Sequence, residues 1–268
     1  MKKPAISIIT ICKNSSKTIA NTIRSILDQP VDGVEYIIID GCSTDGTQEI
    51  IKTFGNKVNI FVSEPDNGIS DAFNKGIALA SGDIIGLINS DDALLPGTLQ
   101  KVIDFFAQNT NIKIMHGDVL FYDLNQYVKR ISPPARWWLP WRMGTFNIHP
   151  ATFVKRDIYE KYGYFNTSYK FAMDDDLFLK WLTAGERISY YPEPLVKVQA
   201  GGLSGRYAFK VFGEKRRALL EHGFSRILTD IQYVCWFAGQ FLVLLQQLFR
   251  QIATRRMEIF DNGINRGN

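Results

Sequence analysis

Short apolar segments alternate with amphipathic segments through the first 120 residues of this chain, and this alternation restricts its fold more than any other feature. Between the apolar segments, hydrophobic residues recur at the i, i+4, i+8 spacing of one helix face, as at Ile69, Phe73 and Ile77. The expected strands are residues 6–12, 36–39, 60–62, 84–88 and 113–119. Strands separated by helices form βαβ units with parallel pairing. The sequence therefore predicts an α/β fold with a mostly parallel central sheet and flanking helices.

Composition and charge narrow the class of protein. The 268 residues are 46% hydrophobic, which is ample for a packed core. The three cysteines, Cys12, Cys42 and Cys235, lack metal-like spacing, so we expect neither zinc nor disulfides, and a cytoplasmic location. Residues 1–200 carry 21 basic and 22 acidic side chains, whereas residues 201–268 carry 10 and 5. A near-neutral body argues against nucleic-acid binding. The basic tail indicates that the C-terminal part of the chain contacts an acidic surface.

Two adjacent aspartates, Asp91 and Asp92, follow the strand expected at residues 84–88. Neighbouring carboxylates repel each other and resist burial. The carboxyl ends of parallel strands, however, are where α/β proteins bind ligands. Carboxylate oxygens at that edge suit Mg²⁺ or Mn²⁺, which share their ligands with substrate phosphates. The alternative is an aspartate that caps the helix expected around residues 94–106.

Polar residues also follow the first two expected strands. Thr10 and Asn14 lie at the end of the first strand, and Asp40 ends the second. A carboxylate only accepts hydrogen bonds, so Asp40 would favour a base with a ring N–H, such as uracil, thymine or guanine. A turn followed by a helix cap explains the same residues equally well. The sequence has neither the G-x-G-x-x-G of dinucleotide-binding dehydrogenases nor a P-loop, which leaves a sugar-nucleotide site built on carboxylates and a metal.

Four motifs in this order resemble those of family 2 glycosyltransferases, which have the GT-A fold. They are ISIITICKN, IIIDGCSTDGT, EPDNGISDAFNKGIALASGD and LINSDDALLP, and the similarity covers residues 5 to about 120. Further on, HPATF, MDDDLFLKWL and GGLS are similar to the branch that acts in bacterial exopolysaccharide and O-antigen assembly, the colanic-acid type. The resemblance implies a GT-A domain over residues 1–205, with a nucleotide-binding half to about residue 120 and an acceptor half over residues 121–205. Residues 206–268 would form a C-terminal helical extension.

The resemblance also implies the activity and the donor site. The chain would be an inverting hexosyltransferase that moves a sugar from a nucleotide diphosphate donor, with UDP favoured, to a lipid-linked or saccharide acceptor in surface-polysaccharide biosynthesis. Asn89-Ser90-Asp91 occupies the position of the D-x-D motif, with Asn89 in place of the first aspartate and Asp91 as the metal ligand. Asp71 and Lys75 would lie beside the nucleotide, although an i, i+4 ion pair without function explains their spacing too. The expected donor-binding residues are Thr10, Asn14, Asp40, Asp71, Lys75, Asn89, Ser90 and Asp91.

The catalytic base is expected among three consecutive aspartates at residues 174–176. In the implied reaction an acceptor hydroxyl loses its proton to a carboxylate, while a metal stabilises the departing diphosphate. Successive helix residues point about 100° apart, so only one of the three faces the cleft. The family motif aligns Asp174 with the base, although Met173 stands where an acidic residue is usual. His149 and Trp138 would lie near the acceptor or the diphosphate.

Two other functions remain as alternatives. A sugar-nucleotide pyrophosphorylase shares a related sheet and would release pyrophosphate. A sugar-nucleotide-binding module without catalysis would explain why Asn89 and Met173 depart from the family pattern.

An uncharged segment near the C-terminus indicates a helix that lies on a membrane surface. Residues 231–249 carry no charge but contain four glutamines, which makes a spanning helix a poor fit. Its aromatic and leucine side chains, followed by Arg250, Arg255 and Arg256, are typical of an interfacial helix. The sequence thus predicts peripheral contact with the inner face of the cytoplasmic membrane through residues 225–256. A helix that packs on the catalytic domain, or in a homo-oligomer, is the alternative.

Overall fold

The structure is a computed structural model of the chain, and it describes residues 3–123, 126–132, 149–199, 208–235 and 238–239. The chain divides into two compact units, residues 1–222 and 223–268. The boundary follows His222, so the helix at residues 208–221 belongs to the first unit, whereas the sequence suggested a boundary near residue 205. None of the described helices combines the length and the apolar composition that crossing a bilayer requires.

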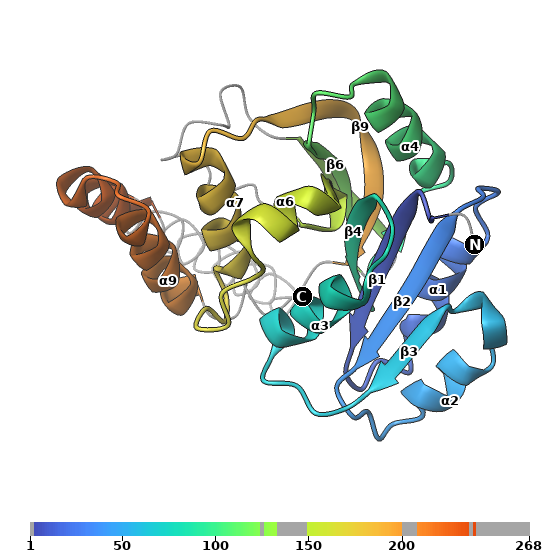
Figure 1. The fold of residues 1–268 in the computed structure, drawn as a ribbon. Coiled ribbons are helices and arrows are strands. Elements are labelled where there is room, and N and C mark those ends of the chain that lie inside the picture. The colour runs from blue at the N-terminus through green and yellow to red at the C-terminus, as the bar shows by residue number, and fades with distance from the viewer. Residues whose placement is uncertain (1–2, 124–125, 133–148, 200–207, 236–237, 240–268) are drawn as a thin grey trace, which may run out of the picture. The chain divides into compact units, whose positions relative to one another are not determined.

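Within the described residues, nine strands of the first unit form one sheet, with helices on both faces (Figure 1). The first half of the chain gives β1 (Ile6–Cys12), α1 (Ile19–Leu27), β2 (Val34–Asp40), α2 (Thr47–Lys52), η1 (Gly55–Lys57), β3 (Ile60–Ser63), α3 (Ile69–Leu79), β4 (Ile84–Asn89), β5 (Ala93–Leu94) and α4 (Thr98–Gln108). The second half gives β6 (Ile114–Asp123), β7 (Gln126–Ile131), η2 (His149–Ala151), β8 (Thr152–Lys155), α6 (Arg156–Tyr162), α7 (Met173–Thr183), β9 (Ile188–Gln199) and α9 (Ala208–Glu221).

The strand order is β3-β2-β1-β4-β8-β6-β9-β5, with β7 paired to β6. The strands β3, β2, β1 and β4 are parallel, as the sequence predicts, whereas β8 runs antiparallel to both β4 and β6. In register, Cys12 lies opposite Asp40, and Ile11 lies opposite Asn89. The carboxyl ends of β1, β2 and β4 therefore meet at one edge of the sheet, which is where α/β sheets bind ligands.

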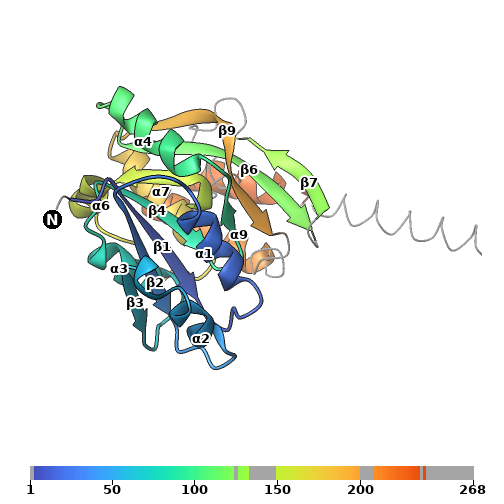
Figure 2. The ribbon, with the colours of Figure 1, turned by 90° about the vertical axis from the view of Figure 1, so that its right-hand side faces the viewer.

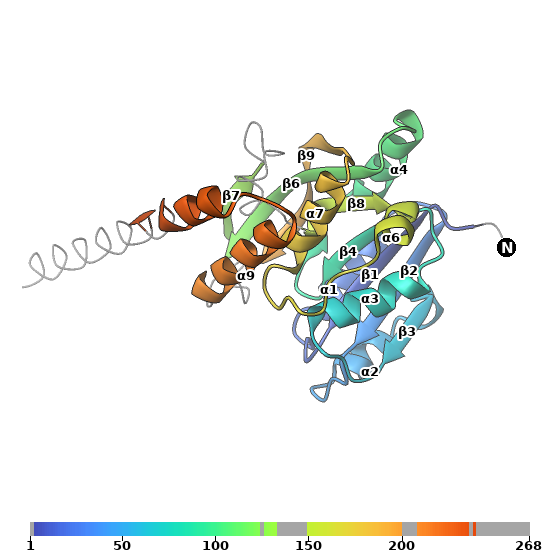
Figure 3. The ribbon, with the colours of Figure 1, turned by 60° about the vertical axis from the view of Figure 1, so that its left-hand side comes forward.

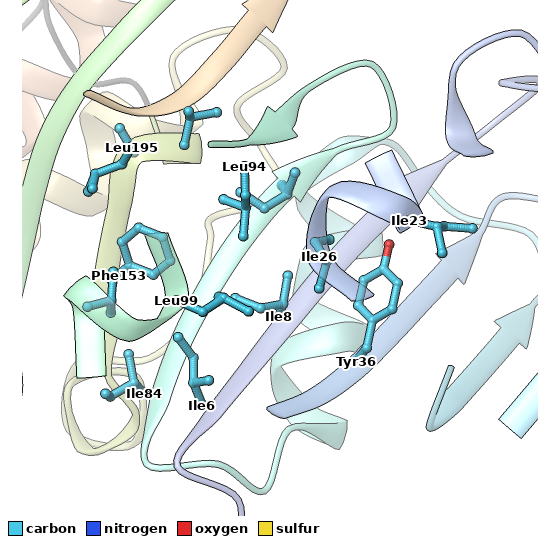
Figure 4. Close-up of a cluster of buried hydrophobic side chains, with 14 of the residues drawn as sticks. Ile6, Ile8, Ile23, Ile26, Tyr36, Ile84, Leu94, Leu99, Phe153 and Leu195 are labelled. Carbon is cyan, nitrogen blue, oxygen red and sulfur yellow. The ribbon is translucent and has the colours of Figure 1, made fainter. Parts of the chain in front are cut away.

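The main core lies between the sheet and the helices α1, α2 and α4. Ile26 of α1 packs with Ile8 and Tyr36 of the sheet, and all three are essentially inaccessible to solvent (Figure 4). Burying one such side chain contributes about 1.5–3 kcal/mol. Figure 2 brings α1 and α4 to the front of the sheet. This core fixes the strand ends that carry the polar residues.

Helix α3 covers the opposite face, where it contacts β1 and β2 (Figure 3). Gly76 allows the close approach, because a Cβ at this position would lie 2.3 Å from Ile9 Cγ2. The approach brings the start of α3 close to the sheet edge that carries the strand ends.

Candidate active site

The loops that follow β1 and β2 are tied to each other. Asn14 and Cys42 both have left-handed backbones, with φ of 51° and 57°, which is uncommon for residues other than glycine. The Asn14 N–H donates to Ser43 Oγ at 2.7 Å, and Asn14 Oδ1 accepts from the Thr44 N–H at 2.9 Å. Such strained positions persist only where surrounding contacts hold them, and they are common at ligand sites.

Asp40 is fully buried at the end of β2. Its carboxylate accepts hydrogen bonds from the Ser43 N–H at 3.0 Å and from the Ser63 hydroxyl at 2.6 Å, and it also accepts from the Ser43 hydroxyl. A base could therefore reach this carboxylate only if the segment that covers it moves. In this structure Asp40 holds the loop of Cys42 and Ser43.

Asp66 also lies at this edge, and the sequence analysis did not single it out, although it lies inside the EPDNG motif. A Cβ on Gly41 would come within 2.1 Å of Asp66 Oδ2, so this carboxylate rests against the backbone that follows Asp40. A side chain at position 41 would therefore require the Asp66 carboxylate to move. Thr10, by contrast, is fully buried in β1, and its hydroxyl accepts a hydrogen bond from the Tyr36 hydroxyl at 3.1 Å. The Thr10 side chain thus belongs to the core.

Asp71 and Lys75 form the expected i, i+4 pair at 3.5 Å, but Lys75 Nζ lies closer to Glu64, at 2.8 Å. Lys75 also donates to the Pro65 carbonyl at 2.7 Å, and Asp71 accepts from the Asn67 N–H at 2.9 Å. Both residues therefore hold the loop between β3 and α3, which carries Asp66.

A chain of hydrogen bonds connects the end of β4 to α7. Asn89 Nδ2 donates to Asp92 Oδ2 at 2.9 Å, and Asn89 Oδ1 lies 3.2 Å from His149 Nε2. His149 Nδ1 lies 2.8 Å from Asp174 Oδ2. Both ring nitrogens thus face acceptors, which favours the doubly protonated ring. Burial alone would lower the pKa of His149, but the adjacent Asp174 carboxylate raises that pKa above its ordinary value.

Asp92 is not a helix cap, contrary to the alternative drawn from the sequence. Helix α4 begins only at Thr98, with Gly97 as its N-cap, and the short strand β5 follows Asp92 instead. Asp92 is buried, and its pKa is raised to about 7 by burial and by the neighbouring Asp91. The Thr22 hydroxyl donates to the Asp92 carbonyl at 2.7 Å and helps to hold this segment.

Asp91 is exposed at the same edge, and Ser90 Oγ lies 2.8 Å from Ser15 Oγ of the β1 loop. No group of three or more His, Cys, Asp or Glu side chains that could enclose a metal ion is present among the described residues. An exposed carboxylate at a ligand-binding edge nevertheless fits a hard cation that takes its other ligands from phosphates and water. Asp91 is therefore chemically suited to the metal role expected of it.

The three aspartates of α7 face different neighbours. Asp174 contacts His149, whereas Asp175 lies 3.4 Å from Lys215 Nζ and Asp176 lies 2.9 Å from His222 Nε2. The second oxygen of Asp174, Oδ1, is buried and accepts no hydrogen bond from the described residues. The helix thus presents one carboxylate to the strand-end site and two to α9. Trp138, expected near the acceptor, lies outside the described residues.

Residues 7–178, more than half of the chain, match the family model described as Glycosyl transferase family 2. The chain belongs to this family. It is a glycosyltransferase, as the motifs predicted. A family 2 relative from Mycobacterium tuberculosis, a PGL/p-HBAD biosynthesis glycosyltransferase, is 26% identical over 228 residues, which are 79% of this chain and 84% of its own length.

One further relative matches a shorter part of this chain, and a solved structure matches most of it. TuaG of Bacillus subtilis, named for teichuronic acid biosynthesis, is 32% identical over 111 residues, which are 40% of this chain and 44% of TuaG. The solved structure of S. aureus TarS 1–349 superposes on this chain with a TM-score of 0.65 and 20% sequence identity. The superposition covers 85% of this chain and 68% of the TarS chain. This likeness confirms the predicted GT-A fold.

Proposed function

We propose that this enzyme transfers a sugar, with inversion, from a UDP-linked donor to a lipid-linked or saccharide acceptor in the assembly of a bacterial surface polysaccharide. TarS has been solved with UDP and with UDP-GlcNAc, and a Pyrobaculum calidifontis mannosyltransferase of similar fold with GDP-Man and Mn²⁺. Two of the relatives above are named for teichuronic acid biosynthesis and for PGL/p-HBAD biosynthesis. These likenesses support a nucleotide-sugar donor and a Mg²⁺ or Mn²⁺ cofactor for this chain.

The proposal rests on the hydrogen bonding and burial of the two oxygens of the Asp174 carboxylate. One oxygen contacts His149 at 2.8 Å, and the other is buried with no donor among the described residues. A buried acceptor without a partner is costly, and a ligand hydroxyl that donates to Oδ1 would remove this cost. We assign Oδ1 as the atom that takes the proton of the acceptor hydroxyl, while His149 holds the carboxylate through Oδ2.

The donor half of the site supplies binding and charge neutralisation. Asp91 would hold the divalent ion against the donor diphosphate, and the ion would stabilise the charge that develops on the leaving group. Ser90, Asn14 and Asp66 line the loops at this edge, and Asn89 fixes the Asp91 segment from within. Proton removal at Asp174 and departure of the diphosphate at Asp91 therefore take place on either side of Asn89 and His149.

The function is tested by identifying what is released from the donor. The purified enzyme is incubated with UDP-, GDP- or dTDP-sugars, Mn²⁺ and a mixed pool of lipid-linked acceptors. We expect release of UDP and transfer of the sugar. Release of pyrophosphate would instead identify a pyrophosphorylase. Thermal stabilisation by the donor without turnover would identify a binding module, since a ligand at about 100 times its Kd stabilises by about 2.7 kcal/mol.

We further propose that the enzyme attaches peripherally to the inner face of the cytoplasmic membrane. The described part of the second unit is helical over residues 226–235, and its exposed apolar side chains lie at helix-face spacing. They are Ile227, Leu228, Ile231 and Val234. Most of the apolar stretch and the arginines that follow it, at residues 236–256, lie outside the described residues apart from 238–239.

The double variant Ile227→Asp/Ile231→Asp should lose co-sedimentation with vesicles that contain anionic lipid at low salt. The apolar face is then charged and is repelled by the lipid. Asn56→Asp/Asn111→Asp, two exposed positions of the first unit, adds the same charge and should leave binding unchanged. Wild-type protein that stays in the supernatant would contradict membrane attachment, and a dimer in sedimentation analysis would then assign the face to a second copy.

A further inference from the structure

Helix α9 lies beside α7 (Figure 1). It supplies a carboxylate to the backbone just before α7. Glu214 Oε2 accepts hydrogen bonds from three consecutive N–H groups, those of Lys170 at 3.0 Å, Phe171 at 2.7 Å and Ala172 at 3.0 Å. Successive N–H groups of this kind form an anion-binding concavity. Ala172 is the N-cap of α7 and has no side chain that could cap the helix. The anion that fixes the start of α7 therefore comes from a residue about 40 positions away in the sequence.

Other side chains of α9 hold the same segment. Arg217 donates to the Ser168 carbonyl at 3.1 Å and lies 3.8 Å from the centre of the Tyr169 ring. The Tyr169 hydroxyl donates to Glu221 at 2.6 Å. Together with the Lys215–Asp175 contact, and with the contact between Asp176 and His222, the residue after α9, these bonds hold residues 168–176 in place.

We propose that Glu214 is a positioning residue for the catalytic base: by holding residues 170–172 it sets where α7 begins and so places Asp174 against His149. Asp174 lies only two residues beyond Ala172, in the first turn of α7. A displacement of that turn moves Oδ2 away from His149 and Oδ1 away from the acceptor hydroxyl. Glu214 lies outside residues 7–178, so this role belongs to a part of the chain beyond the family match. The inference rests on the proposed role of Asp174 as base.

The test uses Glu214→Ala, the conservative Glu214→Gln and a control, Glu160→Ala, whose carboxylate pairs with Arg156 on the surface of α6. The first readout is the NMR spectrum of the imidazole rings in the full-length protein. The chain has only three histidines, so the His149 signals are assigned by their loss in His149→Gln. The second readout is kcat and KM for the donor that the release assay identifies. His116, buried in β6, serves as an internal reference.

In Glu214→Ala we expect the His149 signals to move and those of His116 to stay. We expect kcat to fall by about 10–100-fold at nearly constant donor KM, because misplacing a catalytic group by about 1 Å costs up to about 10²-fold. Glu214→Gln should recover much of the loss, since its amide oxygen still accepts from the three N–H groups. Glu160→Ala should behave as wild type.

Unmoved His149 signals in Glu214→Ala would overturn the proposal, as would an unchanged kcat in a variant that circular dichroism shows to be folded. Movement of the His116 signals together with those of His149 would also overturn it, because the effect would then be general loss of structure. If the wild type turns over no donor, the proposed function fails, and the His149 signals alone still decide whether Glu214 positions Asp174.

Discussion

Asp174→Asn should lower kcat by about 10²–10⁴-fold, the usual contribution of a general base, while the affinity for the nucleotide-sugar donor stays unchanged. The amide cannot take the acceptor proton, but it fills the same volume and its oxygen can still face His149. The carboxylate lies on α7, whereas Asp91, the residue expected to hold the metal against the diphosphate, follows β4. Steady-state kinetics gives kcat, and calorimetric titration with the donor and Mn²⁺ gives the affinity.

Asp175→Asn is the matched control, because Asp175 is the next residue of the same helix but faces Lys215 of α9. It should keep most of the turnover, since the Lys215 side chain is partly exposed and can still be solvated. A large loss in Asp175→Asn with near-normal turnover in Asp174→Asn would move the base by one residue. Equal losses of donor affinity and kcat in Asp174→Asn would instead assign Asp174 to donor binding.

The nucleotide-binding half of the fold is predictable because its signals are local. Parallel strands that are buried on both faces are continuous apolar runs, and helices on a sheet have one apolar face. Residues 6–12 were accordingly predicted with their observed bounds as β1. Two strands outside the alternation of strands and helices were missed: β5, with two residues, and β8, with four. Strands this short have no period of their own, and β3, which also has four residues, was predicted because it lies between helical segments.

The twelve-residue strand β9 was missed for another reason. Pro192 and Pro194 lie in its middle, and proline cannot donate a ladder hydrogen bond, so the segment reads as irregular. The structure accommodates both prolines where the pairing with β6 is irregular, with register shifts around Asp118. A bulge of this kind is set by the partner strand, and the local sequence therefore does not reveal it.

The motifs located the site, but the contacts inside it depend on residues far apart in the chain. His149 is 60 residues from Asn89 and 25 from Asp174, and no periodicity relates them. The departure of Asn89 from the family pattern has a local reason. An amide is the group of that size that can donate to Asp92 and accept from His149 at once. An aspartate there would face the buried Asp92 carboxylate without a donor to offer.

Asp91→Asn should abolish both turnover and the Mn²⁺-dependent part of donor binding. A diphosphate is a poor leaving group unless a cation neutralises its charge, and Asp91 is the exposed carboxylate at the end of β4. The amide keeps the size of the side chain but is a weaker ligand for a hard cation. Thermal unfolding measured with the nucleotide, with and without Mn²⁺, isolates the metal-dependent stabilisation. That stabilisation should vanish in the variant, while the protein without ligands unfolds as before.

Asp104→Asn provides the comparison, since Asp104 is a carboxylate on the surface of α4 that accepts a hydrogen bond from Gln100. Its Mn²⁺-dependent stabilisation and its turnover should equal those of the wild type. Asp91→Asn that retains more than about a tenth of the turnover would have lost less than about 1.4 kcal/mol of transition-state stabilisation. That is too little for the loss of a metal ligand, and Asp92 would then become the candidate. Asp92 would then have to become exposed and lose its hydrogen bond from Asn89 when the ion binds.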